Sequence, residues 1–504
     1  MLMIASVVAS AQKDQSARFA ELITTEGLKS KLTILASADM EGRETATPGQ
    51  KKAAAYIEAE FKRMGLQPGN GNSYQQLYPV YRDSLSKAIL RVNGQSFTWD
   101  KDFVLPLRSL AFGNFTYTNV VFAGYGIVDA EGKINDLNGL DVKGKLVLVL
   151  DGSPEGYKPP AGAGRRFVSP ASTSGKIVAA RTAGAAAVLV VTADFPKKAI
   201  TPTKGEMYLK PNTNGAVSGT VSASVASAML GRTKAMDIAA IKSLEKGSYV
   251  AEVNIQTEKT VETLESSNVV GIIPGTDKKD EYLFLTGHYD HLGKRGNVIY
   301  YGADDDGSGT VGVMQMAEAF AAAAKKGNKP RRTLVFMTVS GEEKGLWGSD
   351  YYSEHPIFPL EKTTADLNTD MIGRVDTERK TADTLNYIYV IGHDKLSSEL
   401  PIINEGMNKK YTNLVLDYKY DDPKDQNQIY YRSDHYNFAK KGVPILFFYD
   451  GMLQADYHRP TDTVEKINFE LMQKRTKLVF YTAWEMANRD NMLKRDTPLN
   501  MPNR

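Results

Sequence analysis

The second half of the chain alternates strand-like and helix-like segments, and this alternation limits the folds that the chain can adopt. From residue 267 onward, short runs of β-branched and aromatic residues are separated by polar turns and helical patterns. Strands that alternate with helices form parallel sheets whose crossover helices cover the faces of the sheet. The sequence therefore predicts an α/β fold with a mixed, mostly parallel sheet flanked by helices.

The individual elements can be placed by residue range. Strands are expected at residues 282–286, 333–339, 365–369 and 444–449. Helices are expected at residues 17–36, 47–64, 310–326 and 469–493. Proline near the start of a helix and glycine after its end are the usual start and stop signals, and Pro48 and Gly65 provide them for the second helix.

Between about residues 103 and 250 the pattern changes to short β-rich runs separated by turn residues. A chain of 504 residues has room for roughly three domains at about 150 residues each. We therefore expect a signal-peptide remnant at residues 1–12, a catalytic domain formed by residues 13–105 and 251–504, and an inserted β-rich domain at residues 106–250.

Charge and hydropathy exclude several classes of partner. The chain has 62 basic and 59 acidic residues, a net charge of +3, so it has no charge pattern typical of nucleic-acid or lipid binding. No apolar run approaches the roughly 18 residues that a membrane span needs. The N-terminal sequence MLMIASVVASAQ is similar to the end of a secretory signal peptide. We expect an exported bacterial protein, periplasmic or secreted, without a nucleic-acid partner or a membrane span; no pattern indicates an oligomeric state.

Side chains of types that commonly bind metals, mostly His, Asp and Glu, follow each of the four predicted strands. In chain order they are His288 and Asp290, then Glu342 and Glu343, then Asp370, and, after a loop, Tyr457 and His458. The loop GADDDGSG, which contains Asp305, lies between the first strand and its crossover helix. Functional groups in α/β sheets gather beyond the carboxyl ends of the strands. We therefore expect these residues to share one edge of the sheet.

A cluster of this kind needs a positive charge. Neighbouring carboxylates repel, and burying an ionised carboxylate is costly unless a cation pairs with it. No Lys or Arg lies inside the GADDDGSG and SGEE turns, although Arg374 and Lys344 are near. The chain has no Cys, so imidazoles and carboxylates would hold the metal, and this ligand set suits zinc. A pair of zinc ions that share one carboxylate would be nearly neutralised by Asp305, Glu343, Asp370 and a bridging hydroxide, which predicts hydrolytic chemistry.

These segments resemble a known family. The motifs GHYDHLG, GADDDGSG, SGEEKGLWGS, NTDMIGR and YHRPTD occur in order, as in the di-zinc exopeptidases of metallopeptidase family twenty-eight, bacterial aminopeptidase branch. The resemblance covers residues 267–470 and extends to the N-terminal segment DMEGRETATPGQKKAAAYI. It implies the zinc-exopeptidase fold, which is phosphorylase/hydrolase-like. The region at 106–250, with GYGI, DVKGKLVLV and KIVAARTAGAAAVLVV, resembles a protease-associated (PA) domain.

The resemblance also implies a role for each motif residue. His288 and Asp370 would bind one zinc ion, Glu343 and His458 the other, and Asp305 would bridge the two. Glu342 would be the general base, Asp290 would orient His288, and Tyr457 would stabilise the oxyanion. The implied protein is a zinc-dependent exopeptidase, an aminopeptidase that removes N-terminal residues of peptides through a hydroxide bridging two zinc ions.

Two other functions are compatible with the same motifs. A glutaminyl cyclase has this fold and a similar ligand set with a single zinc ion, and a receptor-like protein can use the scaffold without catalysis. The remaining histidines are expected to be structural, with His435 also a candidate for the border of the substrate pocket; they are His291, His355, His393 and His435.

Overall fold

The computed structural model describes residues 15–502 except 108–109, 130, 132–133, 161–167, 212–214 and 382. The signal-peptide remnant expected at residues 1–12 lies outside the described residues. The chain divides into two compact units, one formed by Met1–Pro79 and Glu265–Arg504, the other by Val80–Leu264. All the candidate site residues belong to the first unit.

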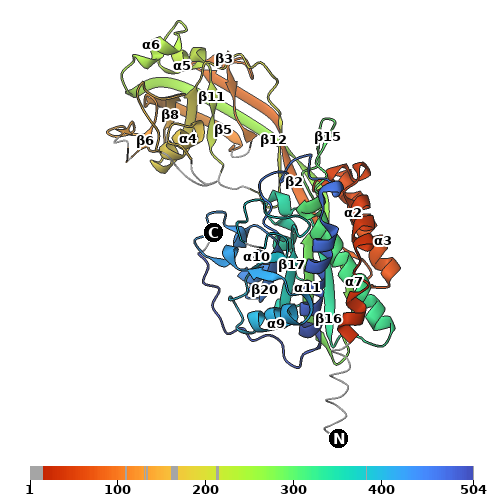
Figure 1. The fold of residues 1–504 in the computed structure, drawn as a ribbon. Coiled ribbons are helices and arrows are strands. Elements are labelled where there is room, and N and C mark those ends of the chain that lie inside the picture. The colour runs from red at the N-terminus through yellow and green to blue at the C-terminus, as the bar shows by residue number, and fades with distance from the viewer. Residues whose placement is uncertain are drawn as a thin grey trace. The chain divides into compact units, whose positions relative to one another are not determined.

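The first unit is built on a mixed sheet with strand order β19-β18-β20-β17-β13-β16-β12. Figure 1 labels β20, β17, β16 and β12 of this sheet. The strands are β12 (Gly247–Ile273), β13 (Lys278–His288), β16 (Arg332–Val339), β17 (Thr363–Thr369), β18 (Tyr387–Ile391), β19 (Val415–Asp417) and β20 (Ile445–Tyr449). β13 pairs in parallel with β16 and β17, and β17 pairs in parallel with β20. The carboxyl ends of these four strands therefore meet at one edge of the sheet.

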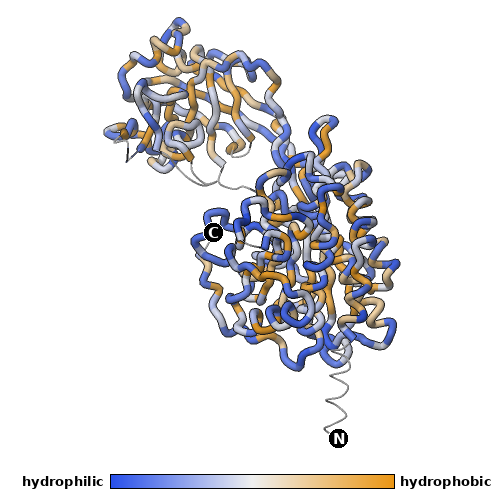
Figure 2. Tube along the Cα trace, in the orientation of Figure 1, coloured by the Kyte–Doolittle hydropathy of each residue, from blue (hydrophilic) through white to orange (hydrophobic). Residues whose placement is uncertain are grey.

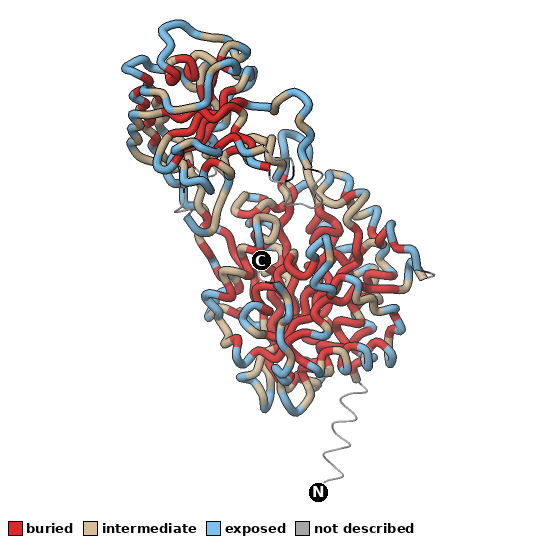
Figure 3. Tube along the Cα trace, turned by 90° about the vertical axis from the view of Figure 1, so that its left-hand side faces the viewer, coloured by how far each residue is buried: buried red, intermediate tan, exposed pale blue. Residues whose placement is uncertain are grey.

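Helices cover both faces of this sheet. The helices are α2 (Thr25–Leu35), α3 (Pro48–Met64), α7 (Gly309–Lys325), α8 (Trp347–Glu354), α9 (Glu399–Met407), α10 (His435–Lys440) and α11 (Phe469–Asn488). In β13, Leu283 and Leu285 belong to the core that includes α7 and α11, whereas Phe284 between them belongs to the core that includes α10. Side chains of a strand alternate between the faces, so a strand covered on both faces is apolar throughout. β16 is accordingly mostly apolar and buried along its whole length, whereas β17 (TTADLNT) is buried but largely polar. Figures 2 and 3 show that hydrophobic and buried segments fill the interior of this unit.

The predicted elements of the second half of the chain are confirmed. The four expected strands correspond to β13, β16, β17 and β20, and the two expected helices to α7 and α11, although α11 ends at Asn488 and not at the expected residue 493. The helix expected at residues 17–36 is instead interrupted: helical residues 15–20 precede α2, because Thr24 accepts a hydrogen bond from the N–H of Gly27 (3.0 Å) and caps α2. Among the described residues, no helix combines the length and the apolar character that crossing a membrane requires.

The second unit is rich in β-structure. A sheet with the order β12-β5-β8-β9-β11-β4 joins β12 to β5 (Gly113–Phe122), β8 (Leu146–Leu150), β9 (Ala187–Val191), β11 (Val217–Val221) and β4 (Phe103–Val104). The unit begins at Val80, before the boundary expected at residue 106. The reason is strand pairing: β2 (Gln75–Val92) pairs within this unit with β10 (Lys204–Tyr208). Its helices are α4 (Thr173–Thr182), α5 (Ala223–Met229) and α6 (Ile238–Lys242).

One buried carboxylate ties the strand ends of the first unit together. Asp306 lies in the turn η3 (Ala303–Ser308), and its Oδ2 accepts a hydrogen bond from the N–H of His288 (3.1 Å). Its Oδ1 accepts hydrogen bonds from the N–H groups of Gly309 (2.8 Å) and Met371 (3.0 Å). The carboxylate of Asp306 therefore joins the end of β13, the start of α7 and the segment after β17.

We expect Asp306→Asn to lower the free energy of unfolding of the EDTA-treated protein by about 1–3 kcal/mol. The amide nitrogen cannot accept a hydrogen bond, so at least one buried N–H loses its partner. Urea unfolding would measure the change, with Asp280→Asn, at an exposed position of β13, as the control. A loss below about 0.5 kcal/mol would contradict this role of Asp306.

Candidate metal centre

Three of the candidate ligands meet at the ends of β13, η3 and β17. Nε2 of His288, the last residue of β13, lies 3.3 Å from Oδ1 of Asp305 and 3.6 Å from Oδ1 of Asp370. Nδ1 of His288 lies 3.1 Å from the backbone oxygen of Asp290. This contact orients the buried ring so that Nε2 faces the two carboxylates.

A second imidazole lies on the other side of Asp305. Nε2 of His458 is 3.1 Å from Oδ2 of Asp305 and 3.0 Å from Oε2 of Glu343. The two oxygens of Asp305 thus face different histidines, and the N–H of Asp305 donates to Oδ2 of Asp462 at 3.1 Å. The structure places the five candidate ligands in one cluster.

The spacing of these donors fits zinc. Nitrogen and oxygen ligands lie about 2.0–2.2 Å from the ion, so two donors on a tetrahedral ion are about 3.3 Å apart. The observed nitrogen–oxygen distances range from 3.0 to 3.6 Å. Nε2 of His288, Nε2 of His458 and Oδ2 of Asp305 are buried, and none has a hydrogen-bond partner among the described residues. Because buried polar atoms are rarely left unpaired, these atoms fit the coordination of a metal.

The electrostatics of the side chains show how strongly the cluster favours positive charge. Burial alone would lower the pKa of His458, but Asp305 and Glu343 raise it to about 10. Burial also opposes the charged form of His288, yet Asp370 and other carboxylates raise the pKa of His288 well above its usual value. Conversely, burial favours the neutral form of Asp305, but contacts with His288 and His458 hold its pKa well below the usual range. A divalent cation would satisfy the same attraction.

Glu342 lies beside the candidate ligands. It follows β16 in the turn η4 (Glu342–Lys344), and its Oε2 is 3.8 Å from Nε2 of His288. Burial raises the pKa of Glu342 well above its usual value, and Glu343 adds to the shift while His288 opposes it. The N–H of Glu342 donates to Oδ1 of Asp290 (3.2 Å), and the same oxygen lies 3.6 Å from Nδ1 of His288. Asp290 therefore contacts both His288 and the backbone of Glu342.

A cavity lies next to this cluster. Its lining is Asp305, Glu342, Asp370, Met371, Ile429, Arg432, Phe447, Tyr449, Leu453 and Tyr457. Nη2 of Arg432 donates to the hydroxyl oxygen of Tyr457 at 2.9 Å, so the hydroxyl hydrogen of Tyr457 is not used in this contact. The ring of Tyr457 stacks on that of His458, with centroids 3.8 Å apart. The candidate oxyanion residue thus borders both the ligands and the cavity.

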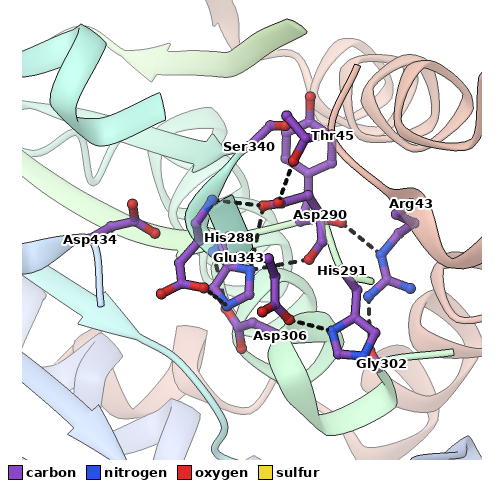
Figure 4. A network of polar contacts seen from close by, with 12 residues as sticks. Arg43, Thr45, His288, Asp290, His291, Gly302, Asp306, Ser340, Glu343 and Asp434 are labelled. Carbon is purple, nitrogen blue, oxygen red and sulfur yellow. Dashed lines mark hydrogen bonds and ion pairs between the residues drawn. The ribbon is translucent and has the colours of Figure 1, made fainter. Parts of the chain in front are cut away.

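His291, expected to be only structural, lies inside the cluster. It is fully buried, and its Nδ1 is 2.7 Å from Oε1 of Glu343, the oxygen that His458 does not contact (Figure 4). The rings of His291 and His458 are 5.9 Å apart. A sequence signal for this position exists, since His291 stands three residues after the ligand His288 within the motif GHYDHLG.

The other histidines lie outside the cluster. His435 is buried, its Nε2 lies 2.8 Å from the backbone oxygen of Tyr430, and its ring stacks at 4.6 Å on Phe447 of the cavity wall. His355 stacks on Tyr351 at 4.3 Å, and His393 contacts Asp421.

The two cations predicted near the cluster, Arg374 and Lys344, pair with other carboxylates, and a third cation is buried beside the cluster. Arg374 donates to Asp456 at 3.0 Å, and Lys344 donates to Glu44 at 2.7 Å. Arg43, far upstream, is instead fully buried beside the cluster (Figure 4). Burial lowers its pKa to about 10, against the opposing effect of Asp290 and other nearby carboxylates. The family resemblance extends to the segment that contains Arg43, but it did not predict that Arg43 would lie beside the metal ligands.

Comparison with known proteins finds peptidases among the relatives of this chain. Residues 268–483 match the model of peptidase family M28. A "probable leucine aminopeptidase" of Trichophyton verrucosum is 30% identical over 227 residues, which cover 44% of this chain and 57% of the relative. The chain therefore spans little more than half the length of this curated relative.

Two solved structures share the fold. The aminopeptidase from Aneurinibacillus sp. strain AM-1 superposes with a TM-score of 0.54 at 19% identity, covering 97% of this chain and 100% of that protein. BSAP, a zinc aminopeptidase from Bacillus subtilis, gives a TM-score of 0.51 at 20% identity and covers 94% of this chain and 99% of BSAP. The segment that matches the family M28 model, residues 268–483, contains all the candidate metal ligands.

Proposed function

We propose that this protein is a zinc-dependent exopeptidase, an aminopeptidase that hydrolyses N-terminal residues of peptides. The observation that carries the proposal is the position of Asp305, whose two carboxylate oxygens face the unpaired ring nitrogens of His288 and His458. One bridging carboxylate between two imidazoles suits a pair of zinc ions, with Asp370 and Glu343 as the outer ligands. The family M28 match and the aminopeptidase relatives support hydrolysis of peptides over cyclisation or a receptor role.

Zinc at such a site lowers the pKa of bound water and polarises a carbonyl group. The protein's own residues would supply the proton transfers. Glu342 lies beside the ligands and lines the cavity, so it would accept a proton from the attacking water and deliver it to the leaving amine. Tyr457, whose oxygen accepts from Arg432, keeps its hydroxyl hydrogen available for the carbonyl oxygen as negative charge develops. Asp290 would hold His288 in the required orientation.

The cavity supports an apolar N-terminal residue in the substrate. Beside the proposed ligands and the base, its wall is formed largely by Met371, Ile429, Phe447, Leu453 and aromatic rings, which suit an apolar side chain. The single cation of this lining, Arg432, is engaged with Tyr457.

We also propose that the second unit is a PA domain. Export to the periplasm or the medium stays a prediction.

A panel of peptides tests the reaction and the end preference together. We expect cleavage of an unblocked Leu-initiated peptide and of its C-terminally amidated form, and no cleavage of the N-acetylated form, because a free α-amine is required. Addition of a zinc chelator should abolish cleavage, and added zinc should restore it. Cleavage of the N-acetylated peptide at the rate of the free one, or activity that survives chelation, would overturn the proposal.

Replacement of Glu342 by Gln should separate catalysis from metal binding. The amide keeps the shape of the side chain but cannot accept the proton of water, so we expect kcat to fall by about 10²–10⁴-fold. Zinc content should stay at the wild-type value, because Glu342 is outside the proposed ligand set. Steady-state kinetics and elemental analysis measure the two effects. Turnover within about twofold of wild type would show that Glu342 is not the base.

A further inference from the structure

Three consecutive residues of the N-terminal segment contact three different loops of the metal centre. Arg43 ends the turn η1 (Ala38–Arg43), and Glu44 and Thr45 follow it before α3. All three residues lie outside the segment that matches the family M28 model. The backbone of this segment already pairs with the loop after His288, since the N–H of His291 donates to the oxygen of Arg43 (3.3 Å) and that of Gly293 to the oxygen of Gly42 (2.9 Å).

The close approach requires glycine at position 42. Gly42 has a φ of 68°, and a Cβ there would lie 2.3 Å from the oxygen of Gly293 and 2.5 Å from that of Tyr300. Both contacts are with backbone atoms, which cannot move aside as a flexible side chain could. The segment is therefore held against residues 293–300 with little freedom to shift.

The guanidinium of Arg43 joins the two loops that carry the first ligands. Nε donates to the oxygen of Tyr289 (2.7 Å), the residue between His288 and Asp290. Nη2 donates to the oxygen of Gly302 (2.9 Å) and Nη1 to that of Tyr301 (2.6 Å), both just before Asp305 in the chain. Arg43 is fully buried, and this planar group of donors spans both loops at once.

Thr45 acts on the same centre through a carboxylate. Its Oγ1 donates to Oδ2 of Asp290 at 2.7 Å (Figure 4). The other oxygen of Asp290 lies 3.6 Å from Nδ1 of His288 and accepts the N–H of Glu342. Thr45 thus fixes the carboxylate that lies between a candidate ligand and the candidate base. Glu44 adds an ion pair with Lys344 (2.7 Å), which is partly exposed and contributes little.

We propose that Arg43 and Thr45 are positioning residues of the metal centre, so that the N-terminal segment sets the zinc affinity of a site whose ligands all lie in the M28 segment. The inference rests on the proposed zinc site. A residue that orients a metal ligand typically contributes 10- to 100-fold to metal affinity. A residue that serves only the stability of the fold has no such effect on the folded protein.

The matched control for Arg43 is Arg332. Arg332 is also fully buried in the first unit, and it donates to the backbone oxygens of Met486 (3.0 Å) and Arg489 (2.7 Å). It begins β16, whereas the metal centre lies beyond the other end of that strand. Both Arg43→Lys and Arg332→Lys therefore remove a buried guanidinium that donates to backbone oxygens. Arg43 lies beside the metal centre, whereas Arg332 lies far from it.

The test is the zinc dissociation constant of the full-length folded protein, measured by competition with a chelator, alongside urea unfolding of each variant. We expect Arg43→Lys and Thr45→Val to raise the dissociation constant about 10- to 100-fold. Thr45→Ser should keep the wild-type dissociation constant. The control Arg332→Lys should change the dissociation constant less than about twofold while lowering the free energy of unfolding. Thr45→Val replaces a small side chain by one of equal size, so it gives an answer even if Arg43→Lys does not fold.

Wild-type affinity in both Arg43→Lys and Thr45→Val, or in Thr45→Val alone where Arg43→Lys does not fold, would overturn the inference and leave the proposed function intact. Failure of Thr45→Ser to restore the affinity lost in Thr45→Val would also overturn it. Absence of zinc binding in the wild type would instead overturn both proposals.

Discussion

The structure depends on the burial of several carboxylates at one edge of a parallel sheet. Each of them needs donors or cations, because an unpaired buried charge is strongly unfavourable. Asp306 obtains three backbone N–H groups, and Asp290 obtains Thr45 and the N–H of Glu342. These two carboxylates have hydrogen-bond donors, and their hydrogen bonds fix the loops that follow the strands. Asp305 and Glu343 face imidazoles whose nitrogens make no hydrogen bonds to them, and they are the groups left for a metal.

Most of this centre could be predicted from sequence because the signals are local. A buried strand ends in a polar turn at each of β13, β16 and β17, and the parallel pairing of these strands brings the turns together. His288 ends β13 and Asp370 follows β17. Predicting where each strand ends was therefore enough to predict where each of these ligands lies. The loop after β20 is longer, yet His458 still reaches Asp305. The family resemblance then supplied the role of each side chain.

The parts that sequence could not predict depend on contacts between distant segments or on side-chain direction. Arg43 reaches the centre only because Gly42 allows the backbone to approach residues 293–300, which no periodicity reveals. His291 was expected to be structural, but in the fold its Nδ1 faces Glu343; its position in the sequence does not show to which side of the loop the ring points. The early start of the second unit at Val80 depends on the pairing of β2 with β10, a register that strand patterns alone do not specify.

The paired zinc site is tested most directly by the zinc content of the wild-type protein and of Asp305→Ala, measured by elemental analysis after dialysis against buffered zinc. We expect two zinc ions per wild-type chain, and loss of both in the variant because they share one carboxylate. Two ions retained by the folded variant would contradict the bridging role of Asp305. A single ion in the wild type would contradict the paired site itself.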